Sequence, residues 1–98
     1  MSESAWQFEA RLIEWRGPAP FVFAPLPHDL SAELKEAARG LMYWGQVPVI
    51  ATIGATEFET AMWPREGRFL LPIKAAAQRT EGIDVGDTVT AVVRLPLT

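Results

Sequence analysis

The chain has 98 residues and a mass of 10.9 kDa, a length that leaves room for one domain with one hydrophobic core. It contains no cysteine and one histidine, which excludes disulfides, thiol nucleophiles and metal sites rich in cysteine or histidine. The formal net charge of −3 argues against a general electrostatic attraction to nucleic acid or to anionic membranes.

The sequence predicts a cytoplasmic protein with a single domain over residues 1–98, in which residues 1–4 form a disordered tail. The first residues lack the basic and apolar segments of a signal peptide. The longest stretch without a charged residue, 41–56, contains glycine, proline and glutamine and is too short to span a membrane. We therefore expect no membrane association.

Two strands are predicted at the start of the chain. Apolar and polar residues alternate over residues 5–16, which predicts a strand with one buried face. The alternation slips by one residue at Ile13, so we expect a bulge or a strong bend there. A short second strand over residues 21–23 is closed by Pro25 and Pro27.

One amphipathic helix is predicted between residues 29 and 40. Apolar side chains recur there at helical spacing, and charged side chains lie on the opposite side. Asp29 is the first candidate for the N-cap and Ser31 is the second. Gly40 is suited to end the helix, because glycine readily adopts the left-handed conformation of a helix C-terminus.

A β-hairpin is predicted in the middle of the chain. Residues 46–63 alternate on both sides of a tight connection at Gly54 to Thr56, which is typical of a hairpin. A turn is expected over residues 64–67, with Pro64 setting a negative backbone φ and Gly67 accepting a positive one.

The last elements complete a mainly β fold. They are a strand over residues 69–73, a short helix over 74–81 and a final strand over 88–95. Six short strands with turn residues between them predict a small six-stranded β-barrel capped by two short helices. A pattern of strand, proline, helix, glycine and strand begins at Phe21 and again at Arg68. Either chance recurrence or an internal duplication explains it, and duplication predicts a pseudo-two-fold barrel.

Four strings carry a resemblance to a known family, and they occur in this order: Leu41–Val49, Thr56–Thr60, Pro64–Lys74 and Arg79–Val89. In these strings the sequence resembles the bacterial family known as domain of unknown function 1905. The likeness covers residues 6–95. Gln78 departs from it, since the family pattern places valine before the arginine.

The resemblance implies a small, partly open β-barrel with helical caps. That architecture is similar to the swapped-hairpin barrels of AbrB-type regulators and MazE-type antitoxins, which are built from two chains. The suspected duplication would allow one chain to form the barrel. The family has no established activity, so the resemblance implies neither a reaction nor a cofactor, and we expect no cofactor.

The candidate ligand site combines aromatic and cationic side chains. Aromatic residues often line pockets, and cations beside them suit an anion. We expect a pocket at the barrel mouth, between the first helix and the 64–67 turn. Its candidate residues are Tyr43, Trp44, Trp63, Arg65, Arg68 and Lys74. The alternative is that the aromatic residues simply pack in the core or cover strand edges.

Other chemical groups are weaker candidates. His28 is a potential general base, but no serine or acid is evidently partnered with it, and a surface histidine at a helix start is ordinary. Glu57 and Glu59 share a strand face and suit a hard cation or acid–base chemistry. The alternation around them equally fits the solvent face of a hairpin. We therefore expect no metal site and no catalytic site.

The sequence favours a non-catalytic binding module for a small ligand or a protein partner, and not an enzyme. The alternative, from fold analogy alone, is a DNA-binding regulator or antitoxin-like protein similar to AbrB and MazE. No basic run occurs in the chain, so a nucleic-acid partner is not expected. Either a monomer or a homodimer is compatible with these patterns.

Overall fold

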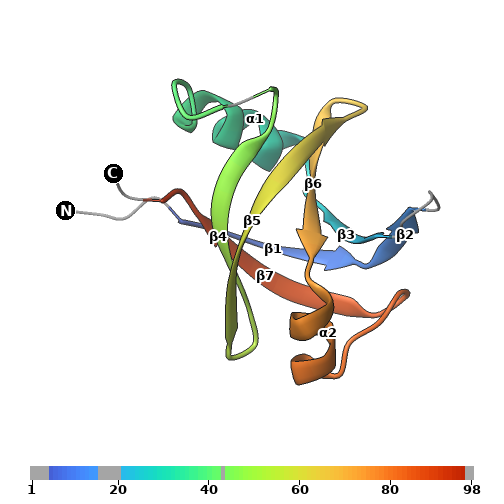
Figure 1. Cartoon of the computed structure of the whole chain (residues 1–98). Coiled ribbons are helices and arrows are strands. Elements are labelled where there is room, and N and C mark those ends of the chain that lie inside the picture. The colour runs from blue at the N-terminus through green and yellow to red at the C-terminus, as the bar shows by residue number, and fades with distance from the viewer. Residues whose placement is uncertain (1–4, 16–20, 43, 97–98) are drawn as a thin grey trace.

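The computed structural model describes residues 5–15, 21–42 and 44–96, which form seven strands and two helices (Figure 1). The strands are β1 (Ala5–Arg11), β2 (Ile13–Trp15), β3 (Phe21–Pro25), β4 (Val47–Ile53), β5 (Thr56–Arg65), β6 (Arg68–Ile73) and β7 (Thr88–Arg94). The helices are α1 (His28–Ala37) and α2 (Ala75–Glu81). The predicted mainly β class with two helices is confirmed.

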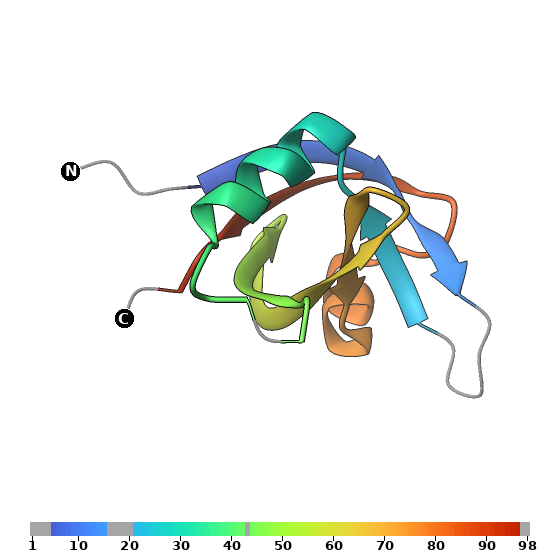
Figure 2. The same ribbon diagram turned by 90° about the horizontal axis from the view of Figure 1, so that it is seen from above.

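The strands form one antiparallel sheet in the order β1-β7-β4-β5-β6-β3-β2. The sheet curls into a half-barrel around the core (Figure 2). The helices lie at opposite ends of it, α1 at the upper end and α2 at the lower end (Figure 1). Curling lets one face of the sheet enclose apolar side chains that a flat sheet of this size would leave exposed.

The seven strands replace the predicted six because the first predicted strand is divided at Leu12. β1 pairs with β7, whereas β2 pairs with β3 at the other end of the sheet. The Leu12 side chain is buried, and its backbone exchanges hydrogen bonds of 2.9 Å with Gly86 and Asp87. The chain therefore changes direction where the alternation slips, and the break predicted at Ile13 falls one residue earlier.

The core lies on the inner face of the curled sheet. β4 shows the pattern most clearly, because its alternate residues Val47, Val49, Ala51 and Ile53 are buried. The core continues through every strand except β2 and through both helices. Leu34 attaches α1 to it and Ala77 attaches α2.

Both predicted N-caps of α1 are wrong. The N-cap is Pro27, whose extended backbone (φ −58°, ψ 151°) is not assisted by any side-chain hydrogen bond. Asp29 lies inside the first turn, where its carboxylate accepts a 2.9 Å hydrogen bond from the Leu30 backbone N–H, and Ser31 is buried against the barrel, so neither residue occupies the cap position. The helix also ends at Ala37 rather than at Gly40, which adopts a positive φ of 93° in the following turn.

The turn predicted over residues 64–67 is shorter than expected. Pro64 and Arg65 belong to β5 and pair with Phe69 and Arg68. The turn consists of Glu66 and Gly67, with φ of 53° and 81°. Two positive φ angles match the natural twist of a two-residue hairpin. Pro64 lies outside this turn, so it does not set a turn angle. The positive φ predicted for Gly67 is confirmed.

The hairpin predicted over residues 46–63 is confirmed as the β4–β5 pair, which extends to Arg65 on its second strand. Helix α2 contacts its turn, where the Thr56 hydroxyl donates a 2.5 Å hydrogen bond to the Glu81 carboxylate. Gly54 has φ of 60°, and a Cβ atom there would collide with this carboxylate. The positive φ favours glycine at this position, and a larger residue would also have to displace the Glu81 carboxylate from Thr56.

The two copies of the suspected repeat occupy corresponding places in the sheet. One is β3-α1-β4 and the other is β6-α2-β7. β3 pairs antiparallel with β6, and β4 pairs antiparallel with β7. These pairings are compatible with a pseudo-two-fold arrangement, but the duplication itself remains a prediction.

Candidate functional site

A hollow of about 600 Å³ opens between α1 and the β5–β6 turn. The helix contributes Ser31, Ala32 and Lys35 to its wall, and the hairpin contributes residues 64–69. Met42 and Gly45, from the connection that follows α1, complete the lining. The two elements that form its walls, α1 and the β5–β6 turn, lie at the same end of the half-barrel (Figure 1). This is the place where the sequence predicts a pocket.

Two polar contacts hold the walls of the hollow together. The Ser31 hydroxyl is buried and accepts a 3.0 Å hydrogen bond from the Phe69 backbone N–H. The His28 Nε2 atom lies 3.2 Å from the Glu66 carbonyl oxygen. Because a carbonyl oxygen only accepts, Nε2 is the protonated nitrogen in this contact. The first turn of α1 is thus joined to the hairpin turn at Glu66 and to β6 at Phe69.

Replacing Ser31 by alanine is expected to lower the free energy of unfolding by about 1–3 kcal/mol, because the buried Phe69 N–H loses its acceptor. Urea denaturation measures this loss. Thr80→Ala, which removes an exposed hydroxyl from α2, is the matched control and should change stability by less than about 0.5 kcal/mol. Equal stabilities of the two variants would show that the Ser31 hydrogen bond contributes little.

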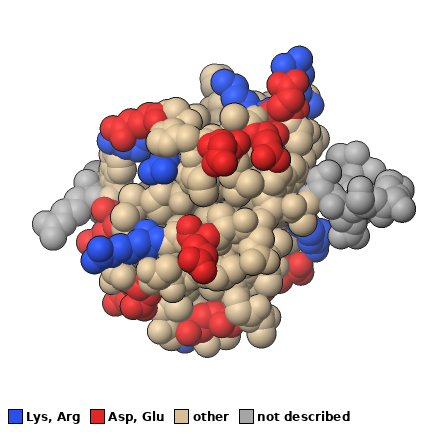
Figure 3. All heavy atoms as spheres, turned by 180° about the vertical axis from the view of Figure 1, so that it is seen from behind, with Lys and Arg blue, Asp and Glu red and all other residues tan. Residues whose placement is uncertain are grey.

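The charged residues around the hollow are predominantly basic. Lys35, Arg65 and Arg68 line it together with one acid, Glu66. The Nε atom of Arg68 is buried and has no hydrogen-bond partner among the described residues. The face shown in Figure 3, by contrast, carries acidic and basic side chains interspersed among uncharged ones. The lining of the hollow therefore has an excess of cations that this face does not have.

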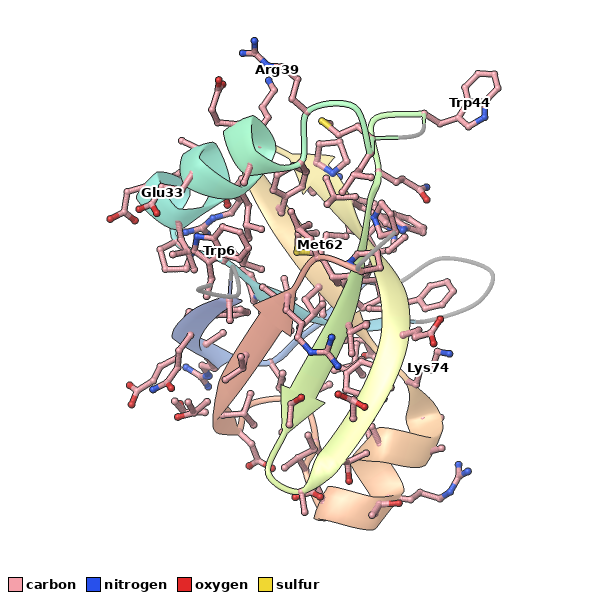
Figure 4. All side chains as sticks on the ribbon, turned by 90° about the vertical axis from the view of Figure 1, so that its left-hand side faces the viewer. Trp6, Glu33, Arg39, Trp44, Met62 and Lys74 are labelled. Carbon is pink, nitrogen blue, oxygen red and sulfur yellow. The ribbon has the colours of Figure 1, made fainter. Side chains whose placement is uncertain are left out.

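The structure separates the predicted site residues into several places. Arg65 and Arg68 line the hollow, and Trp63 lies nearby on β5 without lining it. Trp44 is 85% exposed and points away from the barrel, and Lys74 is the N-cap of α2, far from α1 (Figure 4). Tyr43 lies outside the described residues. Of the five described candidates, only Arg65 and Arg68 line the hollow, so the predicted residues do not form one pocket.

Trp63 belongs instead to an aromatic cluster on β2, β3 and β5. Its ring centroid lies 5.6 Å from that of Phe23 and 6.0 Å from that of Phe21. The Arg65 guanidinium stacks over the Trp15 ring at 3.8 Å from the centroid. Arg65 therefore connects this cluster to the hollow.

Sequence reasoning missed three residues that shape the hollow. They are Ser31, which the sequence suggests as a helix cap, and Lys35 and Met42, which are not among the sequence candidates for the site. Their spacing of about one helical turn places Ser31 and Lys35 on the same side of α1. That spacing is a usable signal, but only the pairing of β5 with β6 brings the hairpin opposite this side.

Two of the weaker candidates make structural contacts: His28 contacts a backbone carbonyl oxygen and Glu57 contacts a surface arginine. Glu57 forms a 2.8 Å ion pair with Arg94 on the exposed face of the sheet. Among the described residues, no group of three histidine, aspartate or glutamate side chains is arranged to hold a metal ion. In the same part of the chain, no helix is both long enough and apolar enough to cross a membrane.

Comparison with known families places the chain. The model of one family, described as a domain of unknown function (DUF1905), matches residues 8–93, which cover both walls of the hollow and all seven strands in part or whole. The chain belongs to the DUF1905 family. No curated protein matches the chain. Membership confirms the resemblance seen in the sequence and assigns no activity to the hollow.

Proposed function

We propose that this chain is a binding module whose hollow takes a small molecule with an apolar body and one anionic group. The observation that carries the proposal is the lining of the hollow, where Lys35, Arg65 and Arg68 stand with a single acid, Glu66. A bound oxyanion would suit these cations, because hydrogen bonds between ionised groups are roughly twice as strong as those between neutral groups.

The dimensions and lining of the hollow support this ligand class. About 600 Å³ lies within the usual range of ligand sites, which is about 300–1,000 Å³. Ala32, Met42, Pro64 and Phe69 provide apolar wall, and Lys35 lines the hollow together with the two arginines. Apolar walls with a few polar groups are typical of small-molecule sites, because the walls supply affinity and the polar groups set orientation.

The DNA-binding alternative receives less support from the charges. Phosphate recognition needs cations gathered on one face, so that several phosphates are neutralised together. The face in Figure 3 carries interspersed charges of both signs, and the basic group at the hollow consists of three residues. We therefore propose the small-ligand module in preference to a regulator or antitoxin.

Hexanoate is a suitable first probe, because it combines a short apolar chain with a carboxylate. Titration followed by backbone amide NMR shifts is expected to move signals of α1 and the β5–β6 turn, and hexanol should bind more weakly. Arg68→Gln is expected to weaken hexanoate binding by about tenfold, since a hydrogen bond to a charged group contributes about 1.5–3 kcal/mol. Native mass spectrometry of gently purified protein would reveal a retained natural ligand.

Arg79→Gln is the matched control, because Arg79 lies exposed on α2 at the other end of the half-barrel. It removes the same charge from the chain without touching the hollow. If hexanoate and hexanol bind equally, or if both arginine variants weaken binding alike, the anion-binding assignment is wrong.

A further inference from the structure

Four strands carry a second apolar layer on the face that is turned away from the core. The register places Ile13 opposite Phe23, Trp15 opposite Phe21, and Trp63 opposite Leu70. Residues opposite one another in an antiparallel pair project from the same face. Phe23 and Leu70 are buried, yet they are not members of the central core, which contains their chain neighbours Ala24, Phe69 and Leu71. We call these six residues, Ile13, Trp15, Phe21, Phe23, Trp63 and Leu70, the aromatic layer.

The aromatic layer is incompletely covered by the described part of the chain. Ile13, Trp15, Phe21 and Trp63 are 39–44% exposed, although they surround the buried Phe23. The rings of Phe21, Phe23 and Trp63 contact one another with centroids 5.6–6.0 Å apart. Rings held in this way lose little conformational entropy when a partner binds, and exposed tryptophan and phenylalanine are typical of interaction surfaces.

A notch of about 170 Å³ lies within the layer, lined by Trp15, Phe23, Trp63, Leu70 and the neighbouring Pro64 and Arg65. A cavity of about 150 Å³ with apolar walls is large enough for a benzene ring. The notch is therefore the size of one large apolar side chain, and it is too small for an extended apolar ligand.

The charge at the layer identifies the complementary partner. Over the paired residues of β2, β3, β6 and the 63–65 stretch of β5, the charged side chains on this face are Arg65 and Arg68. The Arg65 guanidinium carbon lies over the Trp15 ring, 3.8 Å from its centroid, and a guanidinium held over a ring can still donate N–H groups to a carboxylate. Two copies of the chain meeting through this face would bring arginine toward arginine, which disfavours self-association here.

We propose that the aromatic layer docks a peptide segment of a partner protein in which a large apolar side chain is flanked by carboxylates. The apolar side chain enters the notch, and the carboxylates meet Arg65 and Arg68 at its edge. Single-stranded nucleic acid also stacks on aromatic residues, but it needs a basic groove along its backbone. Two arginines on a chain of net charge −3 fit a short acidic peptide better.

The test uses the full chain and a five-residue peptide with a central phenylalanine and two glutamates on each side. Amide NMR shifts are expected to move in β2, β3 and residues 63–70. Trp63→Ala, which leaves the lining of the hollow intact, is expected to weaken binding about tenfold, as for a central interface residue. Val85→Ala is the matched control, because Val85 is a similarly exposed apolar residue (44%) outside the layer.

A charge swap keeps the test valid if Trp63→Ala fails to fold. Arg65 is exposed, so the Arg65→Glu variant should fold normally. This variant should bind the glutamate peptide more weakly, and it should bind more tightly the same peptide with lysines in place of its glutamates. Shifts confined to other surfaces, or no shifts at millimolar peptide, would overturn the proposal. Tighter binding of an oligothymidylate to the layer, or a dimer abolished by Trp63→Ala in sedimentation velocity, would also overturn it.

Discussion

Replacing Phe23 by alanine is expected to lower the free energy of unfolding by about 3–5 kcal/mol, as for other buried phenylalanines. The side chain is 1% exposed and contacts the rings of Phe21 and Trp63, with ring centroids 6.0 and 5.6 Å away. Its removal would leave a cavity beneath the aromatic layer, on the face of the sheet opposite the core. Urea denaturation at equilibrium measures the effect, which is a large share of the total of about 5–15 kcal/mol typical of such domains.

Phe21→Ala is the control for this prediction. Phe21 shares the strand and the face of Phe23, but it is 44% exposed. The same chemical truncation should therefore cost less than about 2 kcal/mol, because less apolar area returns to water. Equal losses in the two variants would contradict the description of Phe23 as the buried centre of a second apolar layer.

Leu34→Ala is expected to cost about 2–5 kcal/mol, since Leu34 is completely buried in the central core. The same variant should weaken hexanoate binding, because Leu34 anchors the helix that forms one wall of the hollow. Stability is measured by urea denaturation and binding by NMR titration. Leu34→Ala should lower both stability and binding because it loosens a wall of the hollow. Arg68→Gln tests the charged contact itself, so the two variants distinguish these causes.

Glu33→Ala provides the comparison within the same helix. Glu33 points away from the half-barrel into solvent (Figure 4), and it does not line the hollow. Its removal should change stability by less than about 0.5 kcal/mol and leave hexanoate binding unchanged. If Leu34→Ala were as mild as Glu33→Ala, the packing of α1 against the core would be looser than the structure indicates.

The candidate site was predictable in position and only partly in composition. Arg65 and Arg68 could be named from the sequence because they flank a turn beside an apolar strand, and a pocket beside the first helix followed from the order of elements. Trp44 and Lys74 were grouped with them because they are near other site residues along the chain. In the structure both lie apart from the hollow, since nearness in sequence decides position only within one strand or turn.

Local patterns in the sequence determined the elements. Alternation located the β4–β5 hairpin and the slip near Leu12, because side chains on a strand change face at every residue. The tertiary structure alone decided which strands pair. The first predicted strand is divided between the two ends of the sheet. Ser31, expected as a cap, accepts a hydrogen bond from Phe69 instead. Phe23 and Leu70 lie in a layer separate from the core. β3 and β6 are apolar on both faces, so their sequences do not indicate which face meets the core. Their pairing with strands distant in the sequence determines it.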